Sequence, residues 1–221
     1  MPTKPITRRD FLKLGCLTTA AAGVAVCGVS TALPIPDESE IDFPSPSYGD
    51  KNMSNRILVT YASGLGSTAE IAVAIGETLG SNGLSVDVKP IQENPQIEDY
   101  QAVLLGSAVR HGNWLPEAVD FVKANQGALN NLPLALFTVH ITNLGNDPAS
   151  IQNRKAFLNQ VRPLLQPVDE AFFAGKFDRR GAALLLPGLL AHFVPTMDFR
   201  NFKKVRAWAE SIRPQLVKQV N

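Results

Sequence analysis

Short apolar runs alternate with amphipathic stretches along most of this chain, and this alternation constrains its fold more than any other feature. Residues 57–61 (ILVTY) are nearly continuously apolar, which is typical of a strand that is buried on both faces. Comparable runs follow, each separated from the next by apolar residues at helical spacing. The pattern predicts strands at 57–61, 84–91, 102–106, 134–139 and 171–175, and helices at 71–79, 116–124, 153–165 and 202–217.

Five strands interleaved with helices predict an α/β fold, a doubly wound parallel sheet with helices on both faces. In sheets of this kind, ligands bind at the carboxyl ends of the strands, where the strand order reverses. The candidate functional segments are therefore the loops after the first, third and fourth strands, at 63–68, 107–114 and 140–143.

The first 32 residues have a different character from the rest of the chain. Arg8 and Arg9 precede Phe-Leu-Lys, and residues 14–36 carry no charge. Paired arginines before a weakly apolar stretch are typical of a twin-arginine export signal. We expect residues 1–32 to be such a signal, cleaved before Leu33, which places the protein in the periplasm or on the outer face of the cytoplasmic membrane. Retention as an anchor is the alternative, because the uncharged run is long enough to span a bilayer.

Residues 33–55 are rich in Pro, Ser and Asp and are predicted to be a disordered linker, so the folded domain is expected at 56–221. Both cysteines, Cys16 and Cys27, lie in the predicted signal, so the mature domain should have no thiol chemistry. Met53 resembles a natural start of such a domain, which leaves an internally initiated cytoplasmic form as an alternative.

Glycines and hydroxyl residues make up the loop at 63–68 (SGLGST), between the first strand and its helix. Glycines let backbone N–H groups converge, and the helix N-terminus adds the positive end of its dipole, so a phosphate monoester fits here without Lys or Arg. The alternative is a turn in which Ser67 or Thr68 caps the helix. The predicted phosphate ligands are Ser63, Gly64, Leu65, Gly66, Ser67 and Thr68.

The loop resembles the Thr/Ser-x-Thr-Gly-x-Thr phosphate loop of the flavodoxin-like family. Ser63, Gly66 and Thr68 match that pattern, and Leu65 departs from it where a hydroxyl residue is usual. Residues 106–114 (GSAVRHGNW) are similar to a Gly-Ala/Ser-Ser-Ile-Arg-Tyr-Gly stretch in the menaquinone-dependent protoporphyrinogen oxidase branch of that family. The segment at 198–202 (DFRNF) also resembles a Phe-x-Asp-Trp segment of that branch, with Asn201 and Phe202 in place of the Asp and the Trp. The resemblance implies the strand order 2-1-3-4-5 and FMN as the cofactor.

The loop after the third strand is expected to border the flavin ring through Ala108, Val109, Arg110, His111, Gly112, Asn113 and Trp114. Trp114 is the candidate for stacking on the ring, and a Trp packed on the sheet is the alternative. Arg110 and His111 would place positive charge near the ring and favour its reduced anion. A surface ion pair is the alternative for Arg110. Gly112 could allow a peptide rearrangement near the ring, or be a plain turn glycine.

After the fourth strand, the candidates are His140, Thr142 and Asn143. His140 could hydrogen-bond the flavin or donate a proton, and a structural histidine is the alternative. The candidate catalytic residues are thus Arg110, His111 and His140. His111, His140 and His192 are isolated from one another, so no metal site is predicted.

Residues 182–194 form an uncharged insert broken by Pro187 and Gly188. This insert is either a lid on the domain or an apolar surface for a quinone, a tetrapyrrole or the membrane interface, with Arg179 and Arg180 beside it. The formal net charge of +1 excludes nucleic-acid binding by bulk charge.

Three functions remain open at this point. The first is an exported FMN-binding oxidoreductase or electron-transfer protein with a redox partner or quinone. The second is a quinone-dependent protoporphyrinogen oxidase, and the third is a flavin-free binding module on the same fold.

Overall fold

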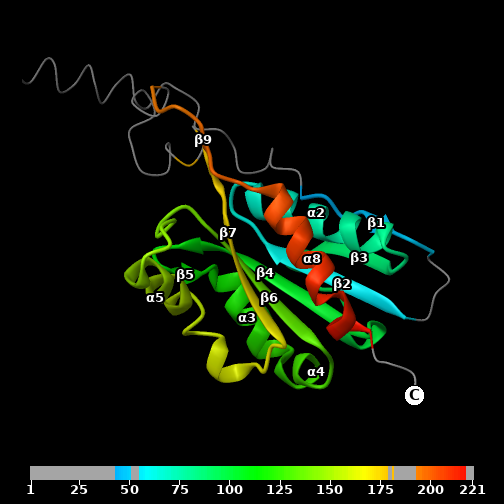
Figure 1. Ribbon diagram of the computed structural model, residues 1–221. Helices are drawn as coiled ribbons and strands as arrows, with labels where there is room; N and C mark the ends of the chain where they lie inside the picture. The colour runs from blue at the N-terminus through cyan, green and yellow to red at the C-terminus, as the bar shows by residue number, and fades with distance from the viewer. Residues whose placement is uncertain (1–42, 51–54, 179–180, 182–192, 218–221) are drawn as a thin grey trace, which may run out of the picture. The chain divides into compact units, whose positions relative to one another are not determined.

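The computed structural model describes residues 43–50, 55–178, 181 and 193–217 (Figure 1). The predicted signal at 1–32, Met53 and most of the apolar insert lie outside the described residues. The chain divides into two compact units, 1–37 with 178–196, and 38–177 with 197–221. In the first unit, the Gly181 amide donates a hydrogen bond to Asp178. The second unit contains the sheet and the three loops that are predicted to bind a ligand.

Five parallel strands make up the central sheet of the second unit. They are β2 (Arg56–Ala62), β3 (Ser85–Pro90), β4 (Ala102–Arg110), β6 (Leu134–His140) and β7 (Asp169–Ala174). Their order is β3-β2-β4-β6-β7, and each pair of neighbours is parallel. The predicted order 2-1-3-4-5 is confirmed. The point at which the strand order reverses, where ligands bind in sheets of this kind, therefore lies between β2 and β4.

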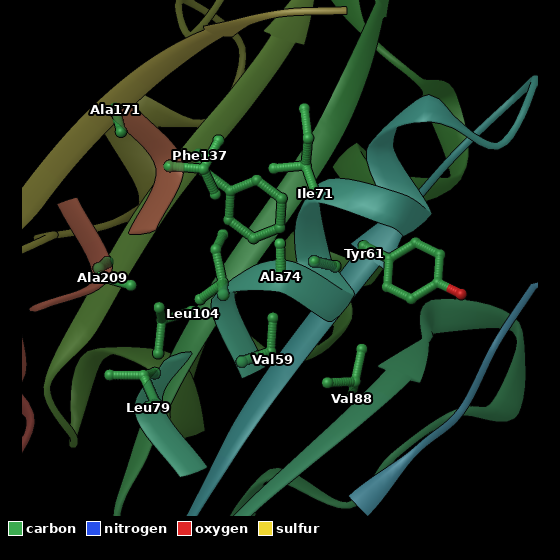
Figure 2. Close-up of a cluster of buried hydrophobic side chains, with 14 of the residues drawn as sticks. Val59, Tyr61, Ile71, Ala74, Leu79, Val88, Leu104, Phe137, Ala171 and Ala209 are labelled. Atoms are coloured by element: carbon green, nitrogen blue, oxygen red, sulfur yellow. The ribbon is translucent and has the colours of Figure 1, made fainter. Parts of the chain in front are cut away.

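Each face of the sheet carries its own hydrophobic cluster. Along β2, Val59 and Tyr61 face one cluster, whereas Leu58 faces the other, as the alternation of side chains along a strand requires. Figure 2 shows the first cluster, formed against α2 (Ser67–Ser81) and α8 (Phe202–Leu216). The second cluster includes buried residues of α3 (Pro116–Ala124) and α4 (Gln126–Asn130). Helices therefore cover both faces, as predicted.

One predicted helix is wrong in its bounds. The helix expected at 153–165 is instead α5 (Pro148–Ala156), followed by turns and a short 3-10 helix, η4 (Arg162–Leu164). Asp147 caps α5 by accepting a hydrogen bond from the Ser150 amide at 2.9 Å, and Pro148 occupies the first turn, where its missing N–H costs nothing. Phe157 is the C-cap residue of α5, and Pro163 in η4 has no amide with which an α-helix could continue to residue 165. Two further 3-10 helices, η2 (Ile91–Glu93) and η3 (Ile97–Asp99), connect β3 to β4.

The prediction of a disordered linker is wrong for residues 43–50, named here the N-terminal strap. The strap contains β1 (Ser47–Tyr48), which pairs antiparallel with β3 at the edge of the sheet. Tyr48 packs against α2 where Gly80 leaves room, since a Cβ on Gly80 would lie 2.4 Å from the Cβ of Tyr48. The folded domain therefore begins before residue 56, because two aromatic residues, Phe43 and Tyr48, pack against the first cluster.

Among the described residues, no helix is long and apolar enough to cross a membrane. The same residues contain no group of His, Cys, Asp or Glu side chains placed to hold a metal ion.

Candidate functional site

The loop between β2 and α2 leaves the N-terminus of α2 open. Gly66 is the N-cap residue, with a φ of 90°, and no side chain caps the helix. Neither Ser67 nor Thr68 is the cap, so the capping alternative does not describe this loop. Ser63 lies upstream and accepts a hydrogen bond from the Gly66 amide at 3.0 Å. The positive end of the helix dipole thus faces a turn made of glycine and hydroxyl residues, an arrangement suited to an anion.

Thr68, in the first turn of α2, carries a buried hydroxyl without a partner. Its side chain is fully buried, and its Oγ1 makes no hydrogen bond in the structure. A buried hydroxyl usually finds a partner, because leaving one unpaired costs about 1–3 kcal/mol. A phosphate oxygen at the helix N-terminus would supply that partner. The other residues of the loop, Gly64, Leu65 and Ser67, are half-buried.

The segment after β4 is a β-hairpin, which the sequence did not predict. Strand β4 runs to Arg110, and β5 (Asn113–Trp114) turns back along it, with Arg110 opposite Asn113 and Val109 opposite Trp114. The two residues between them, His111 and Gly112, have φ values of 51° and 78°. Two successive left-handed residues make the tight turn that suits the twist of a hairpin. Gly112 is therefore a turn glycine in this structure.

Buried hydrogen bonds hold the hairpin to the sheet. The Ser107 hydroxyl accepts a hydrogen bond from the Leu115 amide at 3.1 Å and donates one to the Ala108 carbonyl at 2.9 Å. Trp114 donates from Nε1 to the Thr138 hydroxyl at 2.9 Å, and its side chain is only 2% exposed. In this arrangement, Trp114 has the packing role and presents no face on which a flavin could stack.

The hairpin places the side chain of Arg110 beside the phosphate loop. Its Nη2 atom lies 2.9 Å from the position that a Cβ on Gly64 would occupy. Arg110 and His111 are both exposed, and no ion pair to Arg110 occurs among the residues that the structure describes. Within the described part of the chain, Arg110 therefore does not form the surface ion pair that was the alternative to a role at the flavin.

His140, at the end of β6, is a buried residue that shapes the next loop. It is 4% exposed, and its Nδ1 lies 2.6 Å from the Thr142 carbonyl oxygen. Because a carbonyl only accepts, Nδ1 carries the hydrogen. Burial lowers the pKa of His140, the hydrogen bond to Thr142 opposes this shift, and the nearby charges of Arg154 and Lys204 lower the pKa further. The ring is therefore neutral at pH 7, and the geometry corresponds to the structural alternative.

The loop after β6 is held in a defined shape. Asn143 has a φ of 56°, and Arg154 of α5 donates hydrogen bonds to the carbonyls of Asn143, at 2.6 Å, and Gly145. Three apolar side chains remain about 39% exposed around this loop, Ile141, Leu144 and Ile151. These three residues are named here the apolar rim.

Sequence reasoning did not identify the role of Arg200. This residue follows β9 (Met197–Asp198), which pairs with β8 (Lys176–Phe177). Its guanidinium bonds Asp198, at 2.7 Å, and also Glu70 in the first turn of α2. The hydrogen bonds from Arg200 are the main cause that lowers the pKa of Asp198 to about 2. Two carboxylates thus neutralise Arg200. In the sequence, the Asp-x-Arg spacing at 198–200 is the only sign of this role. The contact with Glu70 has no local pattern, because the two residues are 130 positions apart.

The region that holds these loops matches a known protein family. A family model described as Flavodoxin domain matches residues 58–185. The protoporphyrinogen IX dehydrogenase (quinone) of Escherichia coli K12 is 31% identical over 88 residues, which are 39% of this chain and 49% of the relative. The Leishmania major protein of the same name is 30% identical over 116 residues, covering 49% of this chain and 50% of that protein. The matched regions thus span about half the length of these relatives. The oxidised Flavodoxin 1 of Bacillus cereus has a TM-score of 0.48 and 14% identity, over 76% of this chain and all of that one.

Proposed function

This chain belongs to the flavodoxin domain family, and we propose that it carries out FMN-dependent electron transfer outside the cytoplasm. Family membership makes FMN the cofactor and redox chemistry the general role. When bound, FMN supplies the transfer of one or two electrons. The residues proposed to hold its phosphate are Ser63, Gly66, Ser67 and Thr68, together with the backbone of Gly64 and Leu65.

The observation that supports this assignment best is the unpaired Thr68 hydroxyl at an uncapped helix N-terminus. Both features cost stability in the absence of an anion, and one phosphate would satisfy both. The flanking loops at 108–114 and 140–143 are proposed to border the ring, with the exposed His111 and the backbone of Thr142 and Asn143 as candidates, while the exposed Arg110 lies beside Gly64 of the phosphate loop. His140 is proposed to act by holding the second loop rather than as a proton donor.

Thr68→Val should weaken FMN binding about 10- to 100-fold, because a hydrogen bond to a charged group contributes about 1.5–3 kcal/mol. Thr60→Val is the matched control. Thr60 lies in β2, is also fully buried and also has an unpaired Oγ1. Both variants replace an unpaired hydroxyl with a methyl group, so neither should lower the stability of the flavin-free protein. Quenching of FMN fluorescence measures the affinity.

Equal FMN affinities in the two variants would contradict the proposed phosphate site. A colourless protein that fails to quench FMN fluorescence would instead favour the flavin-free binding module.

A quinone is the proposed electron acceptor. The relatives that this chain resembles are named protoporphyrinogen IX dehydrogenase (quinone), and the apolar rim lies at the loop after β6, with Ile141 and Leu144 in the loop and Ile151 in α5. The second candidate function is protoporphyrinogen oxidation, which the same similarity favours. Export weighs against that second function, because the cytoplasmic side is where that substrate is normally made. Anaerobic assays of quinone reduction, with and without protoporphyrinogen as the electron donor, distinguish the two candidates.

Export depends on the paired arginines near the N-terminus. Replacing Arg8 and Arg9 together with Lys should keep the protein in the cytoplasm, because twin-arginine transport requires that pair. Cell fractionation with marker proteins for each compartment measures the location. The matched control is a double Arg-to-Lys change at the exposed Arg206 and Arg213 of α8, which should leave export intact. Undiminished export of the Arg8 and Arg9 variant would contradict the assignment.

A further inference from the structure

The hairpin places one cation against the phosphate loop, and this cation gives the site a means of selecting its ligand. We infer that Arg110 closes over the bound phosphate and makes the site specific for phosphorylated flavin over riboflavin. The inference rests on the proposed function and deepens it. Its starting point is the position of Nη2, which is 2.9 Å from where a Cβ on Gly64 would stand. Gly64 thus leaves its backbone open to the guanidinium.

Strand pairing and buried hydrogen bonds hold the backbone that carries Arg110. The turn at His111 and Gly112 is tight, and Arg110 pairs directly with Asn113 across the hairpin. Below the turn, Ser107 and Trp114 fasten the hairpin through buried hydrogen bonds. Only the Arg110 side chain, and not the backbone that carries it, then has to be ordered when the contact forms, which limits the conformational entropy that is lost.

Arg110, rather than Arg200, is the arginine near α2 that is available to bind the phosphate. Glu70 lies in the first turn of α2 and opposes an anion at the helix N-terminus. Arg200 is the cation that pairs with Glu70, but Asp198 shares it. Within the described residues, Arg110 has no carboxylate partner. An exposed guanidinium without a partner can make two hydrogen bonds to a phosphate, which Lys cannot do in the same planar geometry.

The test compares FMN with riboflavin, which lacks the phosphate. After removal of bound flavin, the full chain is titrated with each flavin and the fluorescence quenching is followed. Arg110→Gln should weaken FMN binding about 10- to 100-fold and leave riboflavin binding unchanged. Arg110→Lys should fall between the wild type and Arg110→Gln for FMN, because it keeps the charge but loses the paired hydrogen bonds. Arg206→Gln is the matched control, since it removes one exposed positive charge from α8.

The pH dependence gives a second readout. The second pKa of a phosphate monoester is about 6, so an arginine that binds the dianion should make FMN affinity fall as the pH drops through that value. This fall should be smaller in Arg110→Gln than in the wild type. Equal losses for FMN and riboflavin would place Arg110 at the ring and overturn the inference, as would no loss for either flavin. A wild-type chain that binds neither flavin would overturn the proposed function itself.

Discussion

Replacing Asp87 with Ala should lower the free energy of unfolding by about 2–4 kcal/mol, somewhat less than the cost of removing one partner of a fully buried ion pair, because the Arg56 side chain is 35% exposed. Asp87 lies in β3, and its side chain is 4% exposed. It pairs with Arg56 and accepts hydrogen bonds from Ser47 at 2.7 Å and Tyr100 at 2.9 Å. Removing the carboxylate leaves the Arg56 charge and the buried Tyr100 hydroxyl without that acceptor.

Urea unfolding followed by far-UV circular dichroism measures the Asp87→Ala effect. Asp120→Ala is the matched control, because Asp120 is 76% exposed and lies 3.7 Å from Lys123 in α3. An exposed pair of this kind contributes about 0–1 kcal/mol. A similar loss of stability in the two variants would show that the Asp87 cluster contributes no more than a surface pair.

The parallel sheet could be predicted because each central strand is buried on both faces. That burial requires a continuous apolar run such as 134–139, which stands out in any sequence. The strap could not be predicted in this way. Its strand has only two residues, Ser47 and Tyr48, and its composition is that of a linker. What orders the strap is a partner distant in sequence, the α2 surface at Gly76 and Gly80.

The candidate site was predictable in position but not in detail. The carboxyl ends of β2, β4 and β6 had to lie together, because parallel neighbours share one edge. The hairpin that carries Arg110 to Gly64 was missed, because a strand was expected to end at residue 106. Trp114 shows the same limit. Its type suits stacking or packing equally well, and its exposure of 2% and its hydrogen bond to Thr138 show that it is turned into the core.

A chain that starts at Met53 should be less stable by at least about 4 kcal/mol than one that starts at residue 38, where the sheet-containing unit begins. The shorter chain lacks the strap. It loses two half-buried aromatic side chains, Phe43 and Tyr48, from the first cluster. A fully buried aromatic residue contributes about 3–5 kcal/mol, so two half-buried ones should contribute a similar amount together.

Several hydrogen bonds are lost with the strap as well, including the one from the Val88 amide to the Pro46 carbonyl at 2.8 Å, and each contributes about 1 kcal/mol. The Tyr61 hydroxyl donates to the Pro44 carbonyl at 2.8 Å, and the Ser47 hydroxyl donates to Asp87. Urea unfolding of the two chains measures the difference. Tyr48→Ala in the longer chain should account for about half of it, and Ser45→Ala, at an exposed strap position, for almost none. Equal stability of the two chains would show that the strap is dispensable for folding, and Met53 would then be a workable start for a cytoplasmic form.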